Sequence, residues 1–267
     1  MEKVGILAGR GLYPHLFCKS AKKAGVKSVH VVGFHEDTDP ELADICESFD
    51  LVYVGQLNKI IKHFQKHSVT RIVMCGQVKP GRLFKGMKPD FRIIKMLWRI
   101  KEKNAHTLFS GLCDEFSKSG IEVISAVTFL SEYLAKPGVM GKVKMNRARK
   151  KDWEYGKKLA KDCSRLDIGQ TVVVKKGTVL AVEGFEGTDK CIRRGGQLGR
   201  GGVTVVKVAK DDHDMRFDVP CVGMRTVESL IEAKALTLAV ETGKTLFIEQ
   251  EKVMNELNKA GICVVGI

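Results

Sequence analysis

The sequence lacks the short motifs that mark several common enzyme classes. Its eight cysteines are scattered and form no Cys-x-x-Cys pair, which leaves neither a zinc knuckle nor a thioredoxin-like motif. No Gly-x-Ser-x-Gly elbow and no Walker loop ending in Gly-Lys-Ser/Thr occurs. His63 and His67 are one helical turn apart, but Phe64 replaces the glutamate that a zincin needs. Two histidines on the solvent side of a helix are the better interpretation.

Prolines, aromatic residues and long hydrophobic runs are also scarce. No apolar stretch reaches about 18 residues, so the sequence predicts no membrane-spanning helix. With 44% hydrophobic residues, 28% charged residues and only 6 prolines, the chain is typical of a globular protein. Its 12 Phe, 4 Tyr and 2 Trp are too few to interleave with the basic segments, as single-strand nucleic-acid binders require. The Met-Glu-Lys start lacks the layout of a signal peptide, and we expect a cytoplasmic protein.

Positive charge, in contrast, is abundant. The formal net charge is +14, from 45 Lys and Arg against 31 Asp and Glu, which predicts an anionic partner. Nucleic acid, phosphorylated metabolites and a negatively charged membrane face all fit. Residues 79–103 hold nine Lys or Arg and two acids, and 90–101 have the spacing of a basic amphipathic helix. Such a helix either lies on an anionic membrane or packs against a core with its basic face in solvent.

The first half of the chain alternates between predicted strands and helices. Strands are expected at 3–8, 28–33, 51–54, 70–75 and 121–124, and helices at 15–25, 56–67, 90–101 and 104–119. This alternation favours a Rossmann-like domain with a mainly parallel sheet and helices on both faces. Ligands bind such sheets at the carboxyl ends of the strands, here the Gly9–Leu12 and Gly76–Lys79 loops. Gly9 and Gly11 suggest a dinucleotide fingerprint, but Pro14 replaces its third glycine.

The second half is also predicted to be mixed α/β. Residues 135–138 (Ala-Lys-Pro-Gly) form the predicted linker between an N-terminal domain, 1–134, and a C-terminal domain, 139–267. Residues 136–161 carry ten Lys or Arg and suggest a solvated helix face. Strands at 171–174 and 178–182 are expected to pair as a hairpin. Further helices are expected at 226–235 and 249–260, and further strands at 236–240, 245–248 and 262–265.

The most informative stretch is Arg216–Thr226, which places Asp218 between an apolar run and a Pro-Gly loop. A loop carboxylate near cationic, flexible backbone suits a site for phosphate and a divalent metal. An ordinary turn with the carboxylate bonded to backbone donors is the alternative. Similar short polar motifs occur at Asp167–Gln170 and Glu183–Asp189.

Together these motifs resemble one family. The chain is similar to UDP-2,3-diacylglucosamine pyrophosphatases of the lipid A pathway, of the type unrelated to calcineurin-like phosphoesterases. The similar segments, in chain order, are GILAGRGLYP, GQLNKIIKHF, RLDIGQTVVV, LAVEGFEGTD and RFDVPCVGMRTVE. They span nearly the whole chain, and their joint order is more specific than any one motif.

The resemblance implies Mg²⁺-dependent hydrolysis of a pyrophosphate, releasing UMP and 2,3-diacylglucosamine 1-phosphate. The essential aspartate of the family lies in a Val-Asp-Leu-Pro motif, which matches Asp218 in Phe-Asp-Val-Pro. The resemblance carries substrate contacts to Gly11, Leu12, Gly76, Gln170, Thr188 and Asp189, and it aligns Lys207 with a family lysine. It implies a lipid-linked UDP-sugar substrate and suits an anionic membrane surface. No nucleic acid is expected, and a homodimer and peripheral attachment to the inner membrane are left open.

Four positions depart from the family pattern. Arg10 replaces a glycine in the opening loop, residues 105–106 (Ala-His) replace paired aspartates, and His213 replaces a glutamine. The loss of two carboxylates bears on how a metal is held more than on the class of reaction. Asp218 itself is unchanged.

Physical reasoning assigns roles to the charged residues. Hydrolysis of a pyrophosphate needs neutralised phosphate oxygens and a positioned water. Lys207 and Arg216 are candidates to neutralise the phosphates, and Asp218 is the candidate to ligate Mg²⁺ or accept the proton of the water. Asp189 and Glu186 are candidates for a second carboxylate, with Asp189 taken as the second metal ligand. A dinucleotide or nucleotide-sugar oxidoreductase and a non-catalytic nucleic-acid-binding module are the alternatives.

Overall fold

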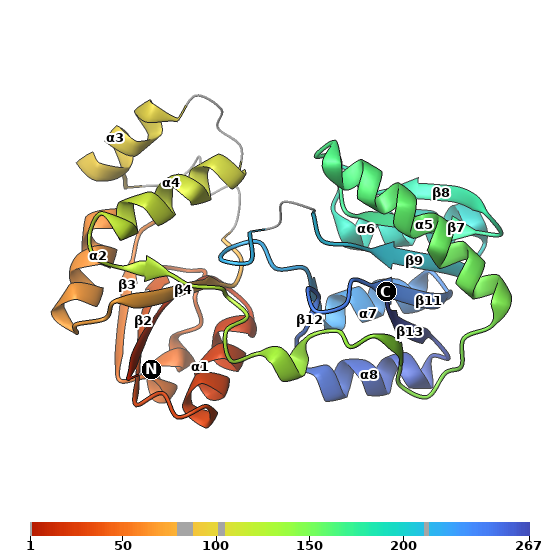
Figure 1. Ribbon diagram of the computed structural model, residues 1–267, viewed down its shortest axis with the longest axis horizontal. Helices are drawn as coiled ribbons and strands as arrows, with labels where there is room; N and C mark the ends of the chain where they lie inside the picture. The colour runs from red at the N-terminus through yellow and green to blue at the C-terminus, as the bar shows by residue number, and fades with distance from the viewer. Residues whose placement is uncertain (1, 79–87, 101–104, 211–213) are drawn as a thin grey trace. The chain divides into compact units, whose positions relative to one another are not determined.

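The computed structural model describes residues 2–78, 88–100, 105–210 and 214–267, with side chains except at 105 and 106. The chain forms two compact units (Figure 1). Unit 1 comprises Met1–Leu130 and Asp214–Phe217, and unit 2 comprises Ser131–His213 and Asp218–Ile267. The chain therefore returns to unit 1 for four residues just before Asp218. The His213 departure lies outside the described residues.

Unit 1 contains a five-stranded, wholly parallel sheet in the order β3-β2-β1-β4-β5, which confirms the predicted α/β class with a mainly parallel sheet. The strands are β1 (Lys3–Ala8), β2 (Ser28–Phe34), β3 (Ser48–Val52), β4 (Arg71–Cys75) and β5 (Glu122–Val123). The helices are α1 (Tyr13–Lys23), η1 (Pro40–Ile45), α2 (Leu57–Lys66), α3 (Phe91–Arg99) and α4 (Ala105–Ser117). The strand order reverses direction between β1 and β4, the position where ligands enter such sheets.

The hydrophobic pattern explains these elements. All of β1 after Lys3 is buried, as expected for a parallel strand covered on both faces. On α2 the buried residues are Leu57, Ile60, Ile61 and Phe64, which is the face predicted from the sequence. These side chains join the core of unit 1 with β-sheet residues such as Ile72. The helix and the sheet thus bury each other.

Unit 2 contains a six-stranded mixed sheet in the order β6-β13-β11-β9-β7-β8. Its strands are β6 (Gly138–Met140), β7 (Thr171–Lys175), β8 (Thr178–Val182), β9 (Val203–Lys207), β11 (Ala235–Val240) and β13 (Cys263–Gly266). Two short strands, β10 (Cys221–Val222) and β12 (Leu246–Phe247), pair in parallel as a separate two-stranded sheet. The remaining elements are η3 (Ser131–Tyr133), α5 (Arg147–Arg165), α6 (Thr188–Gly199), α7 (Met224–Glu232) and α8 (Gln250–Lys259). The predicted β7–β8 hairpin is confirmed.

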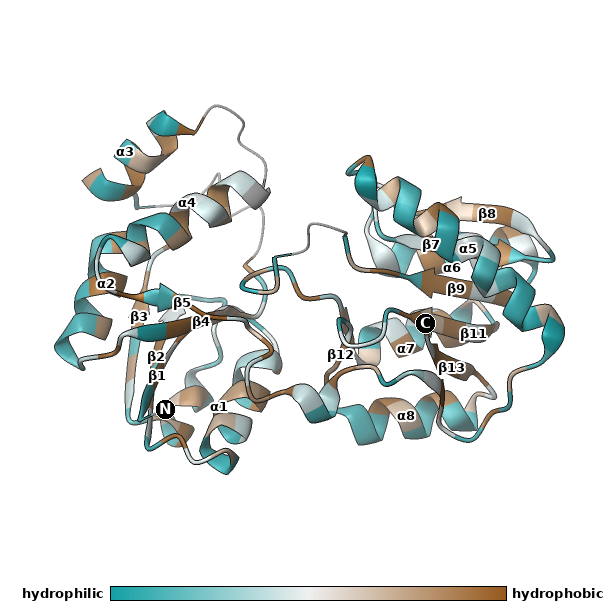
Figure 2. Cartoon of the chain, in the orientation of Figure 1, coloured by the Kyte–Doolittle hydropathy of each residue, from teal (hydrophilic) through white to brown (hydrophobic). Residues whose placement is uncertain are grey.

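Figure 2 shows hydrophobic residues along β9, β11 and β13 and hydrophilic residues along much of α5. The Lys and Arg residues of segment 136–161 therefore supply the solvated face of α5, as predicted. The segment predicted as a linker, 135–138, takes part in unit 2. The Ala135 N–H donates to the Thr245 carbonyl at 2.8 Å, Ala135 is buried, and Gly138 begins β6. The Pro-Gly signal marks the start of an element here, since such residues end a helix whether or not a domain ends with it.

Four elements of unit 2 were not expected from the sequence, namely the short strands β6 and β10, the helix α6 and the strand β9. Glycines make α6 a poor helix by propensity, but close packing requires them. A Cβ on Gly195 would lie 2.5 Å from Val173 Cγ1, and one on Gly196 would collide with the Cα of Ala233. The helix is thus stabilised by its contact with the sheet and α7 rather than by its own sequence.

A histidine cluster in unit 1 corrects one expectation. His63 is largely buried, with a side chain only 10% exposed, and its ring lies 4.9 Å from that of His67. The His30 ring stacks on His67 at 4.7 Å, and Ser48 Oγ lies within hydrogen-bond distance of both His30 Nδ1 and His63 Nε2, at 2.8 and 3.1 Å. His63 is therefore not on the solvent side of its helix. Among the described residues, no helix is long and apolar enough to cross a bilayer.

Candidate functional site

The predicted contacts of unit 1 lie on two loops that pack against each other. Gly9–Leu12 follows β1 and Gly76 follows β4, so both loops lie at the carboxyl edge where the strand order reverses. Arg10 N donates to Gln77 O at 2.8 Å, and Gln77 N donates to Arg10 O at 3.2 Å. The structure therefore brings Gly11, Leu12 and Gly76 to one edge of the sheet.

Backbone shape dominates this part of unit 1. Gly11 and Gly76 have φ of 94° and 91°, a conformation that favours glycine. A Cβ on Gly76 would lie 2.8 Å from the carbonyl carbon of Gly9, so a side chain there would push the two loops apart. Leu12 is 46% exposed and precedes α1, which has no side-chain cap among the described residues. Its first N–H groups can serve a phosphate or hydroxyl oxygen.

Arg216 belongs to unit 1, whereas Asp218, two residues on, belongs to unit 2. The Arg216 guanidinium binds Asp214 with both Nε and Nη2, at distances of 2.6–3.0 Å. This hydrogen bonding raises the pKa of Arg216. Phe217 is fixed beside it by stacking on Phe109, with ring centroids 5.2 Å apart.

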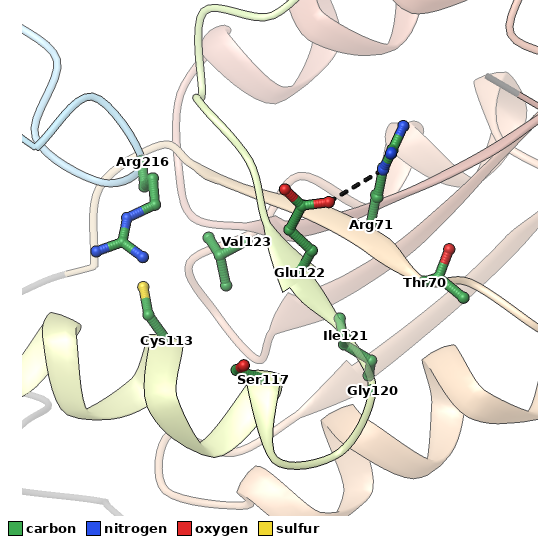
Figure 3. Close-up of a pocket in the computed structure, with 9 residues that line it drawn as sticks. All are labelled: Thr70, Arg71, Cys113, Ser117, Gly120, Ile121, Glu122, Val123 and Arg216. Atoms are coloured by element: carbon green, nitrogen blue, oxygen red, sulfur yellow. Dashed lines mark hydrogen bonds and ion pairs between the residues drawn. The ribbon is translucent and has the colours of Figure 1, made fainter.

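Arg216 also lines an open hollow of about 660 Å³ with Cys113, Glu122, Arg71 and five other residues of unit 1 (Figure 3). Burial raises the pKa of Cys113 to about 11, so its thiol is protonated. Arg71 is paired with Glu122 at 3.1 Å, the dashed line in Figure 3. Both arginines of the hollow thus have carboxylate partners. The substrate contact predicted for Arg216 stays a prediction.

Unit 2 gathers its predicted residues at one edge of its sheet. Because β8 and β9 are each antiparallel to β7, their carboxyl ends meet the beginning of β7. Gln170 precedes β7, Glu183 follows β8 and Lys207 ends β9. The backbone ties them together: Val208 N donates to Gln170 O at 2.9 Å, and Glu183 N donates to Thr171 O at 2.8 Å.

A chain of polar side chains connects this edge to the start of α6. Lys207 Nζ donates to Thr188 Oγ1 at 3.3 Å, and Thr188 Oγ1 donates to Glu183 Oε1 at 2.8 Å. Lys207 and Glu183 are only 7% and 8% exposed. A Cβ on Gly169 would collide with the Glu183 carbonyl oxygen, so that glycine permits the close approach. The network places a buried ammonium group next to the first turn of α6.

Asp218 and Lys207 both act electrostatically on the thiol of Cys221. Asp218 is partly buried and precedes β10, where the Cys221 thiol donates to Val219 O at 3.2 Å. Burial raises the pKa of Cys221 to about 11, while the positive charge of Lys207 opposes the rise and the negative charge of Asp218 adds to it. Both charged groups are therefore close enough to act on one thiol.

The other predicted carboxylates have cationic partners. Asp189, in the first turn of α6, lies 3.2 Å from Arg225 Nη2. Glu186 is bound by Arg194, and this hydrogen bond lowers its pKa. Glu186 is thus committed to Arg194, whereas the partner of Asp189 is itself highly exposed, at 76%.

The donor side chains of this edge limit how a magnesium ion could be held. Among the described residues, no three His, Cys, Asp or Glu side chains gather to hold a metal. Mg²⁺, however, usually keeps several waters and takes one or two carboxylates together with substrate phosphates. Two buried acceptors, Glu183 Oε2 and Gln170 Oε1, have no hydrogen-bond partner within the described structure. So sparse a donor set does not fit a metal held by the protein alone, whereas an ion shared with a ligand's phosphates needs only one or two carboxylates.

Sequence reasoning placed Glu183 only within a motif and gave it no role, and it missed Arg225. The position of Glu183 directly after a predicted strand was a usable signal, because strand ends share one edge of a sheet. Arg225 carried no such signal, since it depends on how α7 packs against α6. Five of the predicted residues belong to unit 2, namely Gln170, Thr188, Asp189, Lys207 and Asp218. The other four belong to unit 1, namely Gly11, Leu12, Gly76 and Arg216.

Comparison with known proteins gives a consistent result. The family models described as LpxI N-terminal domain and LpxI C-terminal domain match residues 3–133 and 136–265. A curated protein of Caulobacter vibrioides, named UDP-2,3-diacylglucosamine pyrophosphatase LpxI, is 31% identical over 280 residues, covering 100% of this chain and 98% of that protein.

Two solved structures show remote similarity. The biotin carboxylase subunit of pyruvate carboxylase is 11% identical with a TM-score of 0.28, over 86% of this chain and 40% of that chain. An N5-carboxyaminoimidazole ribonucleotide synthetase from Thermotoga maritima is 13% identical with a TM-score of 0.25, over 70% and 42%. This chain spans less than half of either, and likeness at this level carries no argument. The two matched domains, in order and over nearly the whole length, show that the chain belongs to the LpxI family.

Proposed function

We propose that this protein hydrolyses the pyrophosphate of UDP-2,3-diacylglucosamine in lipid A synthesis, releasing UMP and 2,3-diacylglucosamine 1-phosphate. Support comes from the full-length relative that bears this activity in its name. Within the molecule, the observation that carries the proposal is the buried Lys207 beside Thr188. Asp218 and Lys207 both act electrostatically on the Cys221 thiol. This combination suits a site for a polyanionic phosphate substrate.

The proposed roles follow from the charges. Lys207 is buried, so its attraction for a phosphate oxygen is screened less than that of a surface lysine. Thr188 accepts from its ammonium group and donates in turn to Glu183. The N–H groups in the first turn of α6 add a second set of donors for phosphate. Asp218 orients the attacking water and accepts its proton. The main requirements of this reaction are neutralisation of the charge on the phosphate oxygens and a positioned nucleophile.

Asp218 and Asp189 are the carboxylates that we propose hold Mg²⁺, together with the substrate. When bound, the ion would neutralise phosphate oxygens and lower the pKa of water. We further propose a cytoplasmic enzyme that meets its lipid substrate at an anionic membrane, and the net charge of +14 supports this partner.

The test is direct hydrolysis of the detergent-dispersed substrate in ¹⁸O-labelled water. Mass spectrometry should detect UMP and the lipid 1-phosphate, and the product that contains ¹⁸O identifies the phosphorus attacked. A chelator should stop turnover, and added Mg²⁺ should restore it. Asp218→Asn is the matched inactive control. Failure of the purified parent to form either product would refute the proposed reaction.

A further inference from the structure

The exposed face of α3 has an unusual composition for a helix in a folded unit. Phe91, Ile94 and Trp98 are 79%, 37% and 87% exposed, although they are large hydrophobic side chains. Their spacing of three and four residues places them on one side of the helix. Lys95 and Arg99 are exposed and flank them. Figure 2 shows hydrophobic and hydrophilic residues alternating along this helix.

This exposure does not arise from a poorly anchored helix. The opposite side of α3 buries Ile93 and Met96 in the core of unit 1. Its N-cap is Asp90, whose carboxylate accepts from Ile93 N at 3.0 Å and from Asn58 N at 2.6 Å. The helix therefore has two apolar sides, of which only one is covered.

The basic residues of α3 differ in their partners. Arg92 is committed to the core of unit 1, where Nη1 donates to Ser119 Oγ at 2.9 Å and Nε lies 3.3 Å from Glu115. Glu115 is itself buried, and it pairs with Lys118 as well as with Arg92. Lys95 and Arg99 are exposed beside Phe91 and Trp98. The sequence grouped all three cations as one basic face, and the structure shows that Arg92 has internal partners.

We infer that the surface formed by Phe91, Ile94, Lys95, Trp98 and Arg99 docks on an anionic lipid bilayer. Aromatic rings favour the headgroup region, and neighbouring Lys and Arg side chains reach the lipid phosphates. Exposed hydrophobic residues elsewhere, such as Leu166, Phe185 and Leu198, lie on different elements. The charge of the α3 surface selects an anionic bilayer over a neutral apolar partner. The inference rests on the proposed function for its biological setting, because a lipid-linked substrate requires contact with a membrane.

The first test measures binding of the full-length protein to sedimenting vesicles of phosphatidylcholine and phosphatidylglycerol, without substrate. Phe91→Gln with Trp98→Gln should weaken binding by at least about tenfold, given the apolar area lost. Lys95→Gln with Arg99→Gln should weaken it by about tenfold or more and reduce its dependence on salt. Vesicles of phosphatidylcholine alone should bind the parent weakly.

Two matched controls remove similar groups elsewhere. Leu198→Gln with Ile231→Gln removes exposed apolar side chains from α6 and α7, and Lys151→Gln with Lys158→Gln removes two charges from α5. Both should bind vesicles as the parent does. If the α5 variant loses as much binding as the α3 charge variant, attraction is a property of the net charge and the inference is wrong.

A spectroscopic test locates the contact. Trp153→Phe leaves Trp98 as the sole tryptophan, and its fluorescence should shift to the blue and be quenched by brominated lipid when vesicles are added. Unchanged Trp98 emission on bound vesicles would overturn the inference. A second outcome would also overturn it. If the parent does not bind vesicles, and light scattering shows a dimer that the Phe91/Trp98 variant does not form, a second copy of the chain covers this face.

These outcomes can be separated from the proposed reaction. The α3 variants should hydrolyse detergent-dispersed substrate at the parental rate, since none of these residues has been placed in the site. Vesicle binding without any hydrolysis would refute the reaction and leave the docking surface intact. Hydrolysis without vesicle binding would refute the docking surface alone.

Discussion

The two units hold their predicted ligand-contacting residues by different means. In unit 1 these are mainly backbone positions, with Gly11 and Gly76 at positive φ on two loops that bond to each other. In unit 2 they are mainly side chains, with Lys207 buried beside Thr188 and Glu183. A backbone surface selects a ligand by shape and close approach, whereas buried charge can stabilise a transition state. The difference predicts that unit 2 carries the chemistry and that unit 1 contributes binding.

The largest effect is expected for Asp218→Asn in unit 2. Loss of the carboxylate removes the proton acceptor for water, so kcat should fall by about three orders of magnitude or more. Asp214→Asn is the matched control, because Asp214 is four residues away but binds Arg216 within unit 1. Its turnover should stay within about tenfold of the parent. Steady-state hydrolysis and thermal unfolding of both variants provide the check, and an active Asp218→Asn enzyme would remove the catalytic role.

A smaller loss is expected for Lys207→Met. Removing one preorganised cationic donor typically costs about a hundredfold in kcat. Lys175→Met is its control, since Lys175 Nζ donates to Gly199 O and Gly201 O at 2.6 and 2.7 Å, at the other end of β7. That change should lower stability and spare turnover. Equal losses of activity in the two variants would mean that Lys207 only supports the fold.

Gly76→Ala probes the backbone surface of unit 1. The new Cβ would press on the carbonyl carbon of Gly9 at 2.8 Å and would strain a φ of 91°. If unit 1 contributes binding, KM should rise by about tenfold with kcat nearly unchanged, as expected for loss of uniform binding. Gly25→Ala imposes similar strain, at a φ of 85° with no neighbour within 4 Å, away from the two loops. A KM change common to both variants would indicate strain alone.

How much the sequence could predict also differs between the units. In unit 1 most strands are followed by a helix of regular periodicity, so the parallel sheet followed from local patterns. In unit 2 the glycines that allow α6 to approach Val173 and Ala233 are the residues that concealed the helix. Motif residues such as Asp218 and Thr188 could be chosen from the sequence, because they lie at strand ends and loops. The division of Arg216 and Asp218 between units could not, since it depends on long-range contacts such as Ala126 N to Met215 O.

The smallest effect concerns pH, and it again separates the units. Burial, the other histidines and nearby charges lower the pKa of His30 and His63 below its ordinary value of 6.5. The unfolded chain therefore binds protons more readily than unit 1, so unit 1 should lose stability as the pH falls below about 6.5. In unit 2, burial raises the pKa of Glu241, but hydrogen bonds from Lys161, Lys244 and Ala209 N outweigh it and lower the pKa from 4.5.

The carboxylate of Glu241 thus stabilises unit 2 above pH 4.5, and this stability should be lost only as the pH falls through the lowered pKa. Between about pH 6 and 5, amide hydrogen exchange should accelerate in unit 1 peptides around β2 and α2 and stay unchanged, after correction for intrinsic rates, in β9 and β11. His30→Gln with His63→Gln should abolish the acceleration, because no imidazole then gains a proton on unfolding at those sites. If the double variant keeps the pH dependence, or if β9 loses protection in the same range, the histidine cluster is not its source.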